Sequence, residues 1–192
     1  MNPHFRLAYV LLVATSLLAP AGGAGAVEPV EAERTEQTHR DRLFDQLKKA
    51  RTEAEGRAIE HAIWEMWMAE APTPEIARTV KQAMDARESY DYERALKLLD
   101  GVVAAAPTYA EAWNQRAFIR FLREDFDGAL EDVEQALKLE PRHFAALSGR
   151  ALVLMRQGRM EAGQKALREA VEIHPWLKER SMLIPEPGGK DI

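Results

Sequence analysis

Apolar and polar positions follow the spacing of amphipathic helices most regularly between Tyr109 and Arg142. The first half of this stretch places a bulky residue, Trp113, four positions before a small one, Ala117. After a turn at residues 124–125, a second apolar stripe with helical spacing follows. This stripe consists of Phe126, Ala129, Val133 and Ala136. Because Pro141 closes the stretch, the pattern predicts two helices that are joined by a tight turn and ended by a proline.

The same unit recurs when the sequence is shifted by 34 residues in either direction. Prolines, small residues and bulky residues keep their places in three successive copies. The matching columns are Pro107, Pro141 and Pro175; Ala83, Ala117 and Ala151; Ala95, Ala129 and Gly163; Tyr92, Phe126 and Met160; Leu99, Val133 and Leu167; and Val102, Ala136 and Ala170. A single hairpin of this kind leaves an apolar face bare, so we expect the repeats to stack on one another.

A period of 34 residues with this order of bulky residue, small residue and proline resembles the tetratricopeptide repeat (TPR). The resemblance implies an all-α fold, namely a helical-hairpin solenoid with about three 34-residue repeats. It also implies a concave groove lined mainly by the first helix of each repeat, which is the usual binding surface of this family.

The residues before the repeats predict a further pair of helices outside the 34-residue register. One helix is expected from about His39 to Arg51, and the capping box at residues 52–55 begins the second. We interpret Trp67 as a core residue of this second helix and leave Trp64 as a possible exposed anchor for a partner. The stretch 39–71 is therefore predicted to form a divergent N-terminal helical hairpin.

The repeats themselves are predicted to occupy residues 72–183. Thr73 and Pro74 are typical of a helix start, and Gly158 is typical of the left-handed residue that ends a helix. A short capping helix is expected at about residues 176–182, where it would cover the apolar face that a fourth repeat would otherwise bury. Residues 184–192 are interpreted as a flexible tail.

Residues 1–26 have the pattern of a cleavable signal peptide. A short segment containing Arg6 precedes an apolar run from Leu7 to Leu18, and small residues follow as far as Ala26. The alternative is a retained membrane anchor, but the run is shorter than the roughly 20 residues that cross a bilayer. We therefore expect export, with the periplasm as the location. Residues 27–38 are Glu-rich and poor in apolar residues, which predicts a disordered leader.

Composition narrows the possible partners. The net charge is −5, and removal of residues 1–26 would make it more negative because Arg6 is the only charged residue lost. This balance argues against nucleic acid and against anionic lipid as partners. The absence of cysteine excludes disulfides and thiolate metal sites, so helix packing alone must stabilise the fold.

The groove positions of the family, transferred to this sequence, indicate a binding surface for a protein or peptide. The candidate residues are Met84, Arg87, Asn114, Phe118, Phe121, Leu152, Met155 and Arg156, with Val80, Leu122 and Ser148 beside them. This surface combines apolar side chains with two arginines, which suits an amphipathic helix or an extended peptide with apolar anchors. The alternative is that the chain's own N-terminal hairpin or tail covers it.

Other chemistry is poorly supported. Chaperone-binding members of the family hold a peptide carboxylate with Lys and Asn, and only Asn114 matches that set. His61 and Glu65 lack a third metal ligand, and we interpret His143 and His174 as ordinary polar residues of the repeat junctions. The acidic run Glu131, Asp132 and Glu134 is interpreted as a solvated helix face. No glycine-rich phosphate loop, nucleophile elbow or paired-carboxylate motif occurs, so we predict neither an enzyme nor a cofactor or small-molecule substrate.

A narrower resemblance joins the export signal, the aromatic run at residues 63–68, the segment 112–114 and the run 139–149. Together they resemble small periplasmic TPR proteins of alphaproteobacteria, which implies a non-enzymatic role in cell-envelope integrity. The leading hypothesis is an exported adaptor or scaffold that holds an envelope protein. The alternatives are a periplasmic assembly or secretion chaperone for client proteins and a self-associating structural element.

Overall fold

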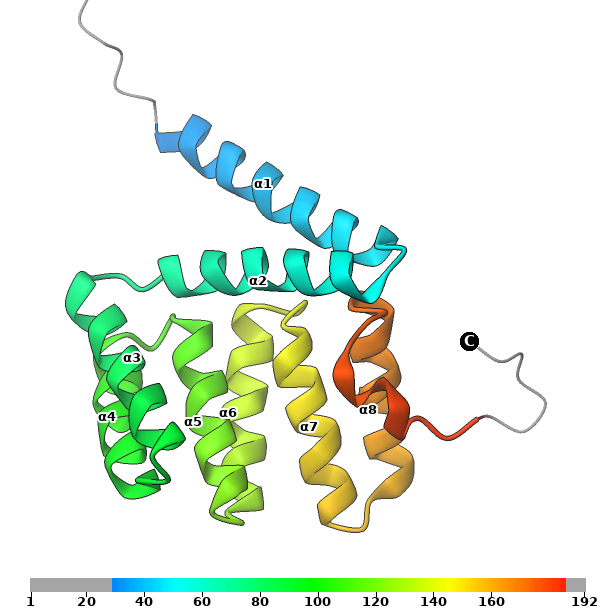
Figure 1. Ribbon diagram of the computed structural model, residues 1–192. Helices are drawn as coiled ribbons and strands as arrows, with labels where there is room; N and C mark the ends of the chain where they lie inside the picture. The colour runs from blue at the N-terminus through cyan, green and yellow to red at the C-terminus, as the bar shows by residue number, and fades with distance from the viewer. Residues whose placement is uncertain (1–28, 186–192) are drawn as a thin grey trace, which may run out of the picture.

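The computed structural model describes residues 29–185, with side-chain surroundings from Glu33 onward. Over this range the chain forms helices joined by turns, which confirms the all-α fold (Figure 1). The elements are α1 (Pro29–Lys49), α2 (Glu53–Ala69), α3 (Pro74–Glu88), α4 (Tyr92–Ala105), α5 (Ala110–Leu122), α6 (Phe126–Leu139), α7 (Phe144–Arg156), α8 (Met160–Ile173) and the 3-10 helix η1 (Lys178–Met182). The predicted signal peptide at residues 1–26 lies outside the described residues.

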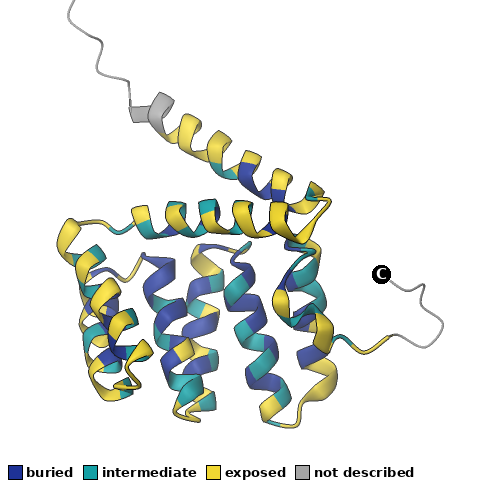
Figure 2. Cartoon of the chain, in the orientation of Figure 1, coloured by how far each residue is buried: buried dark blue, intermediate teal, exposed yellow. Residues whose placement is uncertain are grey.

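Helices α3 to α8 form three hairpins placed side by side, as the repeat pattern predicts (Figure 1). The second helix of each hairpin begins at Tyr92, Phe126 or Met160, which preserves the 34-residue interval. Small residues allow the paired helices to approach closely: a Cβ atom on Gly163 would lie 2.6 Å from Met155 Cγ. The hairpins bury the apolar faces of their helices against each other, while their outer turns stay exposed (Figure 2).

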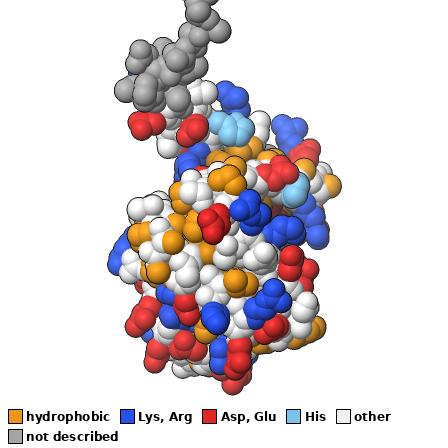
Figure 3. All heavy atoms as spheres, turned by 90° about the vertical axis from the view of Figure 1, so that its left-hand side faces the viewer, with side chains coloured by type: hydrophobic (Ala, Val, Ile, Leu, Met, Phe, Trp, Pro, Cys, Tyr) orange, Lys and Arg blue, Asp and Glu red, His pale blue; other side chains and the backbone are white. Residues whose placement is uncertain are grey.

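The outer face of the first repeat is polar, which ends the solenoid at α3. In the 34-residue register, Arg78 and Asp85 of α3 occupy the places that Ala112 and Ile119 take in α5. Ala112 and Ile119 are buried against the preceding repeat, whereas Arg78 and Asp85 are exposed. Figure 3 views the molecule from this side and shows charged side chains spread over the end, with smaller apolar areas between them. Another repeat would therefore find little apolar surface to pack against at α3.

The N-terminal hairpin does not extend the stack. Helix α2 instead crosses the ends of the three hairpins, and α1 lies above it (Figure 1). Trp67 is buried as predicted: its ring stacks on His143 with 3.9 Å between centroids and lies 5.0 Å from the ring of Phe144. Both His143 and His174 are completely buried, so their interpretation as ordinary junction residues was wrong. The junctions are buried because α1 and α2 cover them.

Further contacts tie the N-terminal hairpin to the end of the second repeat and to the C-terminal segment. The Trp176 indole N–H donates to the carbonyl oxygen of Ala50 over 2.9 Å. Gly56 packs so closely on Trp176 that a Cβ atom at this glycine would lie 2.8 Å from the ring. Arg40 forms ion pairs with both Glu70 and Glu140. These contacts join residues that are far apart in sequence, and they hold α1 and α2 in place.

The predicted leader at residues 27–38 is wrong in part, because α1 begins at Pro29 and continues without a break to Lys49. The described side chains of residues 33–38 are exposed, so this first part of α1 lies outside the hydrophobic core. The composition of residues 27–38 predicted disorder because a segment with few apolar residues makes few core contacts. The helix persists because it continues directly from the packed segment around Leu43, Phe44 and Leu47.

The C-terminal segment caps α8, although η1 is a short 3-10 helix. The side-chain amide of Gln164 donates to the carbonyl oxygen of Met182 over 2.9 Å and accepts from the backbone N–H of Ile184 over 2.7 Å. Leu177 is buried in the same core as Leu167. Ile184 is thus held on α8, in contrast to the flexible tail predicted from residue 184, and residues 186–192 lie outside the described range.

Asp132 departs from the solvated acidic face predicted for α6. Its carboxylate is 1% exposed and accepts two hydrogen bonds from Arg116, over 2.9 and 2.7 Å. Arg116 also donates to Asp100 of the preceding repeat over 2.8 Å. Burial raises the pKa of the Asp132 carboxyl, because the loss of solvation outweighs the attraction of the Arg116 guanidinium. Arg116 therefore joins neighbouring repeats, and Asp132 holds its guanidinium in place.

Each repeat has a residue with a left-handed backbone between its two helices. The φ angles are +62° at Tyr90, +63° at Glu124 and +77° at Gly158, which confirms the predicted helix end at Gly158. Tyr90 and Glu124 carry a Cβ atom in a conformation that favours glycine. The first and second repeats therefore hold backbone strain that the third repeat avoids.

We predict that Tyr90→Gly raises the free energy of unfolding by about 0.5–1 kcal/mol, because it removes this strain. The Tyr90 side chain is 80% exposed, so little packing is lost. Urea unfolding of the purified variant measures the effect. Gly158→Ala is the reverse control and should lower stability by about 1 kcal/mol. A lower stability for Tyr90→Gly would mean that the ring contact between Tyr90 and Tyr92 outweighs the strain.

Candidate functional site

The first helices of the three repeats, α3, α5 and α7, lie side by side and present Met84, Phe118 and Leu152 at equivalent positions. We call the surface around these three residues the inner face. Phe118 is exposed, at 42%, whereas Met84 and Leu152 are half-buried. The guanidinium of Arg87 lies 5.3 Å from the centre of the Phe118 ring, so α3 and α5 meet at this aromatic side chain. The inner face therefore offers one accessible aromatic ring between two partly covered apolar side chains.

The inner face is closed toward the start of α5 by a buried polar network. Glu111 is 1% exposed, and its carboxylate accepts from the side-chain amide of Gln115 over 2.6 Å. His143 Nε2 lies 2.9 Å from the other carboxylate oxygen. Because His143 Nδ1 accepts from the backbone N–H of Ala146, the ring proton lies on Nε2 and points at Glu111. Trp67 stacks on this ring and thus seals the end.

The network reaches back to the inner face through Arg87, whose Nη1 donates to Gln115 Oε1 over 2.9 Å. Asn114 is buried, and its amide lies 3.4 Å from the Glu111 carboxylate. Asn114 therefore serves this network, and its amide is turned away from an incoming carboxylate. A peptide on the inner face would meet Phe118 and Arg87 before it met Asn114.

Two of the predicted site residues belong to a separate cluster at the far end of α5. The Phe121 ring lies 6.0 Å from the Phe126 ring, and the Arg156 guanidinium lies over both, at 6.0 and 5.5 Å from their centres. Arg156 Nη2 also donates to Glu124 over 2.8 Å. We call these four residues the turn-end cluster. It links the turn of the second repeat to the end of α7, and Phe121 is half-buried within it.

The remaining predicted residues serve packing. Met155 lies against Gly163 of α8, inside the third hairpin. Val80 is completely buried, Ser148 is buried, and Leu122 is half-buried. The structure thus brings together Met84, Arg87, Phe118 and Leu152 and separates Phe121, Met155 and Arg156 from them. Sequence reasoning missed Glu111, Gln115 and His143, and the one signal was the position of Glu111 and Gln115 on the groove side of α5.

Neither a cluster of metal-ligating side chains nor a membrane-spanning helix is found among the described residues. Between Glu33 and Pro185, no three His, Cys, Asp or Glu side chains are grouped so that they could hold a metal ion. His61 lies 3.4 Å from Glu65, and both side chains are exposed. Across the part of the chain that the structure describes, no helix has the length and hydropathy needed to cross a bilayer.

Comparison with known proteins identifies the repeats. A family model described as tetratricopeptide repeat matches residues 120–175. A TPR repeat-containing protein of Rhizobium etli is 32% identical over 169 residues, a match that covers 88% of this chain and 82% of the relative. The chain belongs to the tetratricopeptide-repeat family. Proteins of this family generally mediate protein–protein interactions and are typically non-enzymatic adaptors.

Two solved structures share the fold at low sequence identity. The first TPR of Spaghetti, solved with an HSP90 peptide, has a TM-score of 0.54 and 19% identity, and the match covers 56% of this chain and 85% of that one. The type III secretion translocator chaperone SycD of Yersinia enterocolitica also has a TM-score of 0.54, with 18% identity, and the match covers 59% of this chain and 88% of that one. Both matches confirm a solenoid of TPR helical hairpins.

We predict that Phe118 and Phe121 differ in their effect on stability. Phe118→Ser should lower the free energy of unfolding by less than about 1 kcal/mol, because the side chain is exposed. Phe121→Ser should cost at least about 1 kcal/mol more, because it removes an aromatic pair in the turn-end cluster. Paired urea unfolding curves measure both changes. Equal losses would show that Phe121 contributes no more packing than Phe118 does.

Proposed function

We propose that this TPR protein is an exported, non-enzymatic adaptor that holds a peptide segment of a cell-envelope protein on its inner face, in support of envelope integrity. The observation that carries the proposal is the exposure of Phe118 beneath Arg87. Large apolar side chains of α5 otherwise lie at least half-buried, so an accessible ring at this position is a candidate anchor for a partner.

The pattern of burial supports a partner that binds the inner face near Phe118. Residues near the start of α5, Glu111 and Gln115, are buried, and Trp67 and His143 close that end. Farther along α5, Phe118 is the most exposed apolar residue of the candidate set. A bound segment would therefore cross Phe118, with an apolar side chain against the ring and a polar or acidic group near Arg87.

Other members of the fold support a peptide as ligand. The Spaghetti TPR structure contains a bound HSP90 peptide. This chain departs from a Lys and Asn carboxylate clamp, because Val80, Asn114 and Ser148 at the corresponding positions are buried. The segment bound here would accordingly be recognised by an apolar anchor rather than by its terminal carboxylate.

A photoreactive residue in place of Phe118, expressed in living cells, tests the proposal. We expect one defined envelope protein to be crosslinked, and the same probe at Tyr90 should not capture it, since Tyr90 is exposed on a turn. In a parallel pull-down, Phe118→Ser should weaken capture by about tenfold or more, because a buried aromatic anchor is often worth about 2 kcal/mol. Capture of many unrelated proteins would instead favour an assembly or secretion chaperone, and equal capture from both positions would refute the inner face as the site.

The export part of the proposal has a separate test. Cleavage after the small residues near Ala26 predicts a mature protein that begins near Val27 and occurs in the periplasmic fraction. Intact mass measurement of the protein purified from that fraction reads the first residue directly. A mass that still includes residues 1–26 would contradict cleavage, and recovery only from the cytoplasm would contradict export.

A further inference from the structure

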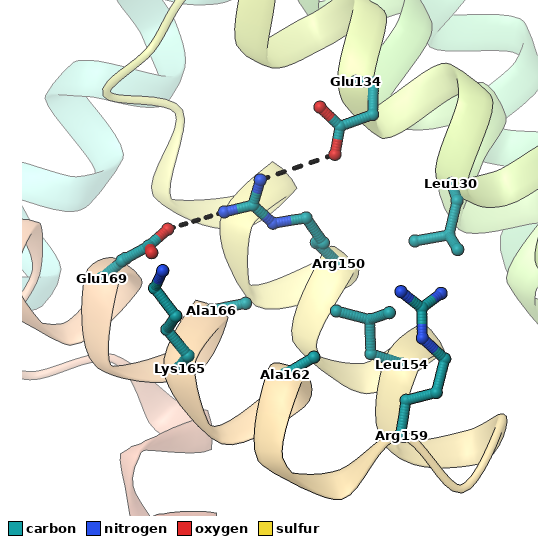
Figure 4. Close-up of a pocket in the computed structure, with 9 residues that line it drawn as sticks. All are labelled: Leu130, Glu134, Arg150, Leu154, Arg159, Ala162, Lys165, Ala166 and Glu169. Carbon is teal, nitrogen blue, oxygen red and sulfur yellow. Dashed lines mark hydrogen bonds and ion pairs between the residues drawn. The ribbon is translucent and has the colours of Figure 1, made fainter.

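A second hollow lies between α6 and α8, with α7 at its base (Figure 4). Its volume is about 390 Å³, and Leu130, Leu154, Ala162 and Ala166 form an apolar floor. Leu154 follows Leu152 of the inner face by two residues, which corresponds to about 200° of rotation around a helix. This cleft therefore opens on the side of α7 opposite the inner face. We call it the outer cleft.

The charged side chains around the floor differ in whether they form ion pairs. Arg150 lies between two acidic residues, with Nη2 2.6 Å from Glu169 and Nη1 3.4 Å from Glu134 (Figure 4). Arg159 and Lys165 also line the cleft, and neither has a carboxylate within ion-pair distance among the described residues. Arg159 Nη1 donates a hydrogen bond to Gln157 Oε1 over 3.3 Å. The rim thus carries two cationic groups without an acidic partner.

The junction between the first and second repeats provides an internal comparison, because the same positions occur 34 residues earlier. There, Arg120 occupies the place of Leu154 and Asp132 the place of Ala166. Arg120 reaches Asp132 over 3.3 Å and donates to the carbonyl oxygen of Gly128 over 2.9 Å, so charged side chains fill the space. In the third repeat, short apolar side chains replace this pair and leave the floor open.

At two rim positions, the charge changes from negative at the first junction to positive at the second. Asp125 and Glu131 of the second repeat correspond to Arg159 and Lys165 of the third. The Asp125 carboxylate accepts from the backbone N–H of Gly128 at the start of α6, whereas Arg159, the residue before α8, makes no such side-chain cap. The acidic groups that the second repeat supplies itself are therefore missing in the third, where basic groups stand in their place.

We propose that the outer cleft binds an acidic peptide segment in which an aliphatic side chain lies beside an Asp or Glu carboxylate. The aliphatic side chain packs on Leu130, Leu154 and Ala166, and the carboxylate lies between Arg159 and Lys165. Charge complementarity favours an acidic partner, because Arg159 and Lys165 lie beside an apolar floor that excludes water from one side. This surface is independent of the inner face, so it provides a second docking site on the adaptor.

The test uses a fluorescently labelled peptide that contains two leucines and two aspartates and has both termini capped. The purified protein is titrated into this peptide. We expect saturable binding with a Kd below about 1 mM. The double variant Arg159→Asp with Lys165→Glu restores the charges of the second repeat and should weaken binding at least about fivefold, because two attractions become repulsions. Absence of saturable binding, or equal binding by this variant, would overturn the proposal.

A second pair of changes tests the floor. Leu154→Arg with Ala166→Asp copies the ion pair of the second repeat, so it should fill the cleft and weaken binding without unfolding the chain. Circular dichroism confirms folding of both double variants. Lys97→Glu, a change of an exposed lysine on α4, controls for net charge and should leave binding intact. Phe118→Ser should also leave it intact, and loss of binding in either control would place the peptide elsewhere.

Other occupants give distinct results. A molecular mass that rises with protein concentration in light scattering, and that Leu154→Arg with Ala166→Asp abolishes, would show that a second copy fills the cleft. Tighter peptide binding by a chain that ends at Pro185 would show that the chain's own C-terminal segment competes for it. Either result would overturn an external acidic peptide as the occupant. Unchanged mass and unchanged affinity in these experiments would support it.

Discussion

The packing of the N-terminal hairpin against the three repeats depends on one constraint, the burial of the Glu111 carboxylate. A carboxylate removed from water must be compensated, and here Gln115, Asn114 and His143 supply the neighbouring donors. His143 can donate because its other ring nitrogen accepts from the start of α7. The resulting orientation of the imidazole presents a flat face to Trp67, and the N-terminal hairpin is thereby placed across the repeats.

This placement gives the solenoid surfaces with different roles. One end of the inner face is sealed by α2, so accessible apolar surface is confined to the region around Phe118. The polar outer face of α3 and the C-terminal segment on α8 close the two ends of the stack. On the opposite side, Arg120 and Asp132 close the first junction, whereas Leu154 and Ala166 leave the second one open. The chain thus presents two separate surfaces with different chemistry.

The sequence could predict the candidate site only as sets of equivalent positions in successive repeats. The register correctly placed Met84, Phe118 and Leu152 at equivalent positions of successive first helices. It could not distinguish Phe118 from Phe121, because Phe126 and Arg156 together leave the Phe121 ring half-buried, whereas Phe118 stays exposed beneath Arg87. Asn114 and Met155 also occupy predicted groove positions. Asn114 instead contacts Glu111, and Met155 packs against α8. Exposure depends on neighbours that the helical period of one segment does not describe.

The sequence by itself determined the period and the bounds of the three repeat hairpins, because both depend on residues close in the chain. The apolar stripe of α2 also marked Trp67 as a core residue, although the rings that bury it come from the start of α7. Gly158 and the small residues of each hairpin mark helix ends and close helix pairs, and both are local. Only the tertiary structure decided where the N-terminal hairpin lies and which polar groups are buried. Trp67, Glu111 and His143 come from three separate helices or their ends, and their contacts leave no periodic trace. The burial of Asp132 likewise required Arg116 to be placed against it by packing.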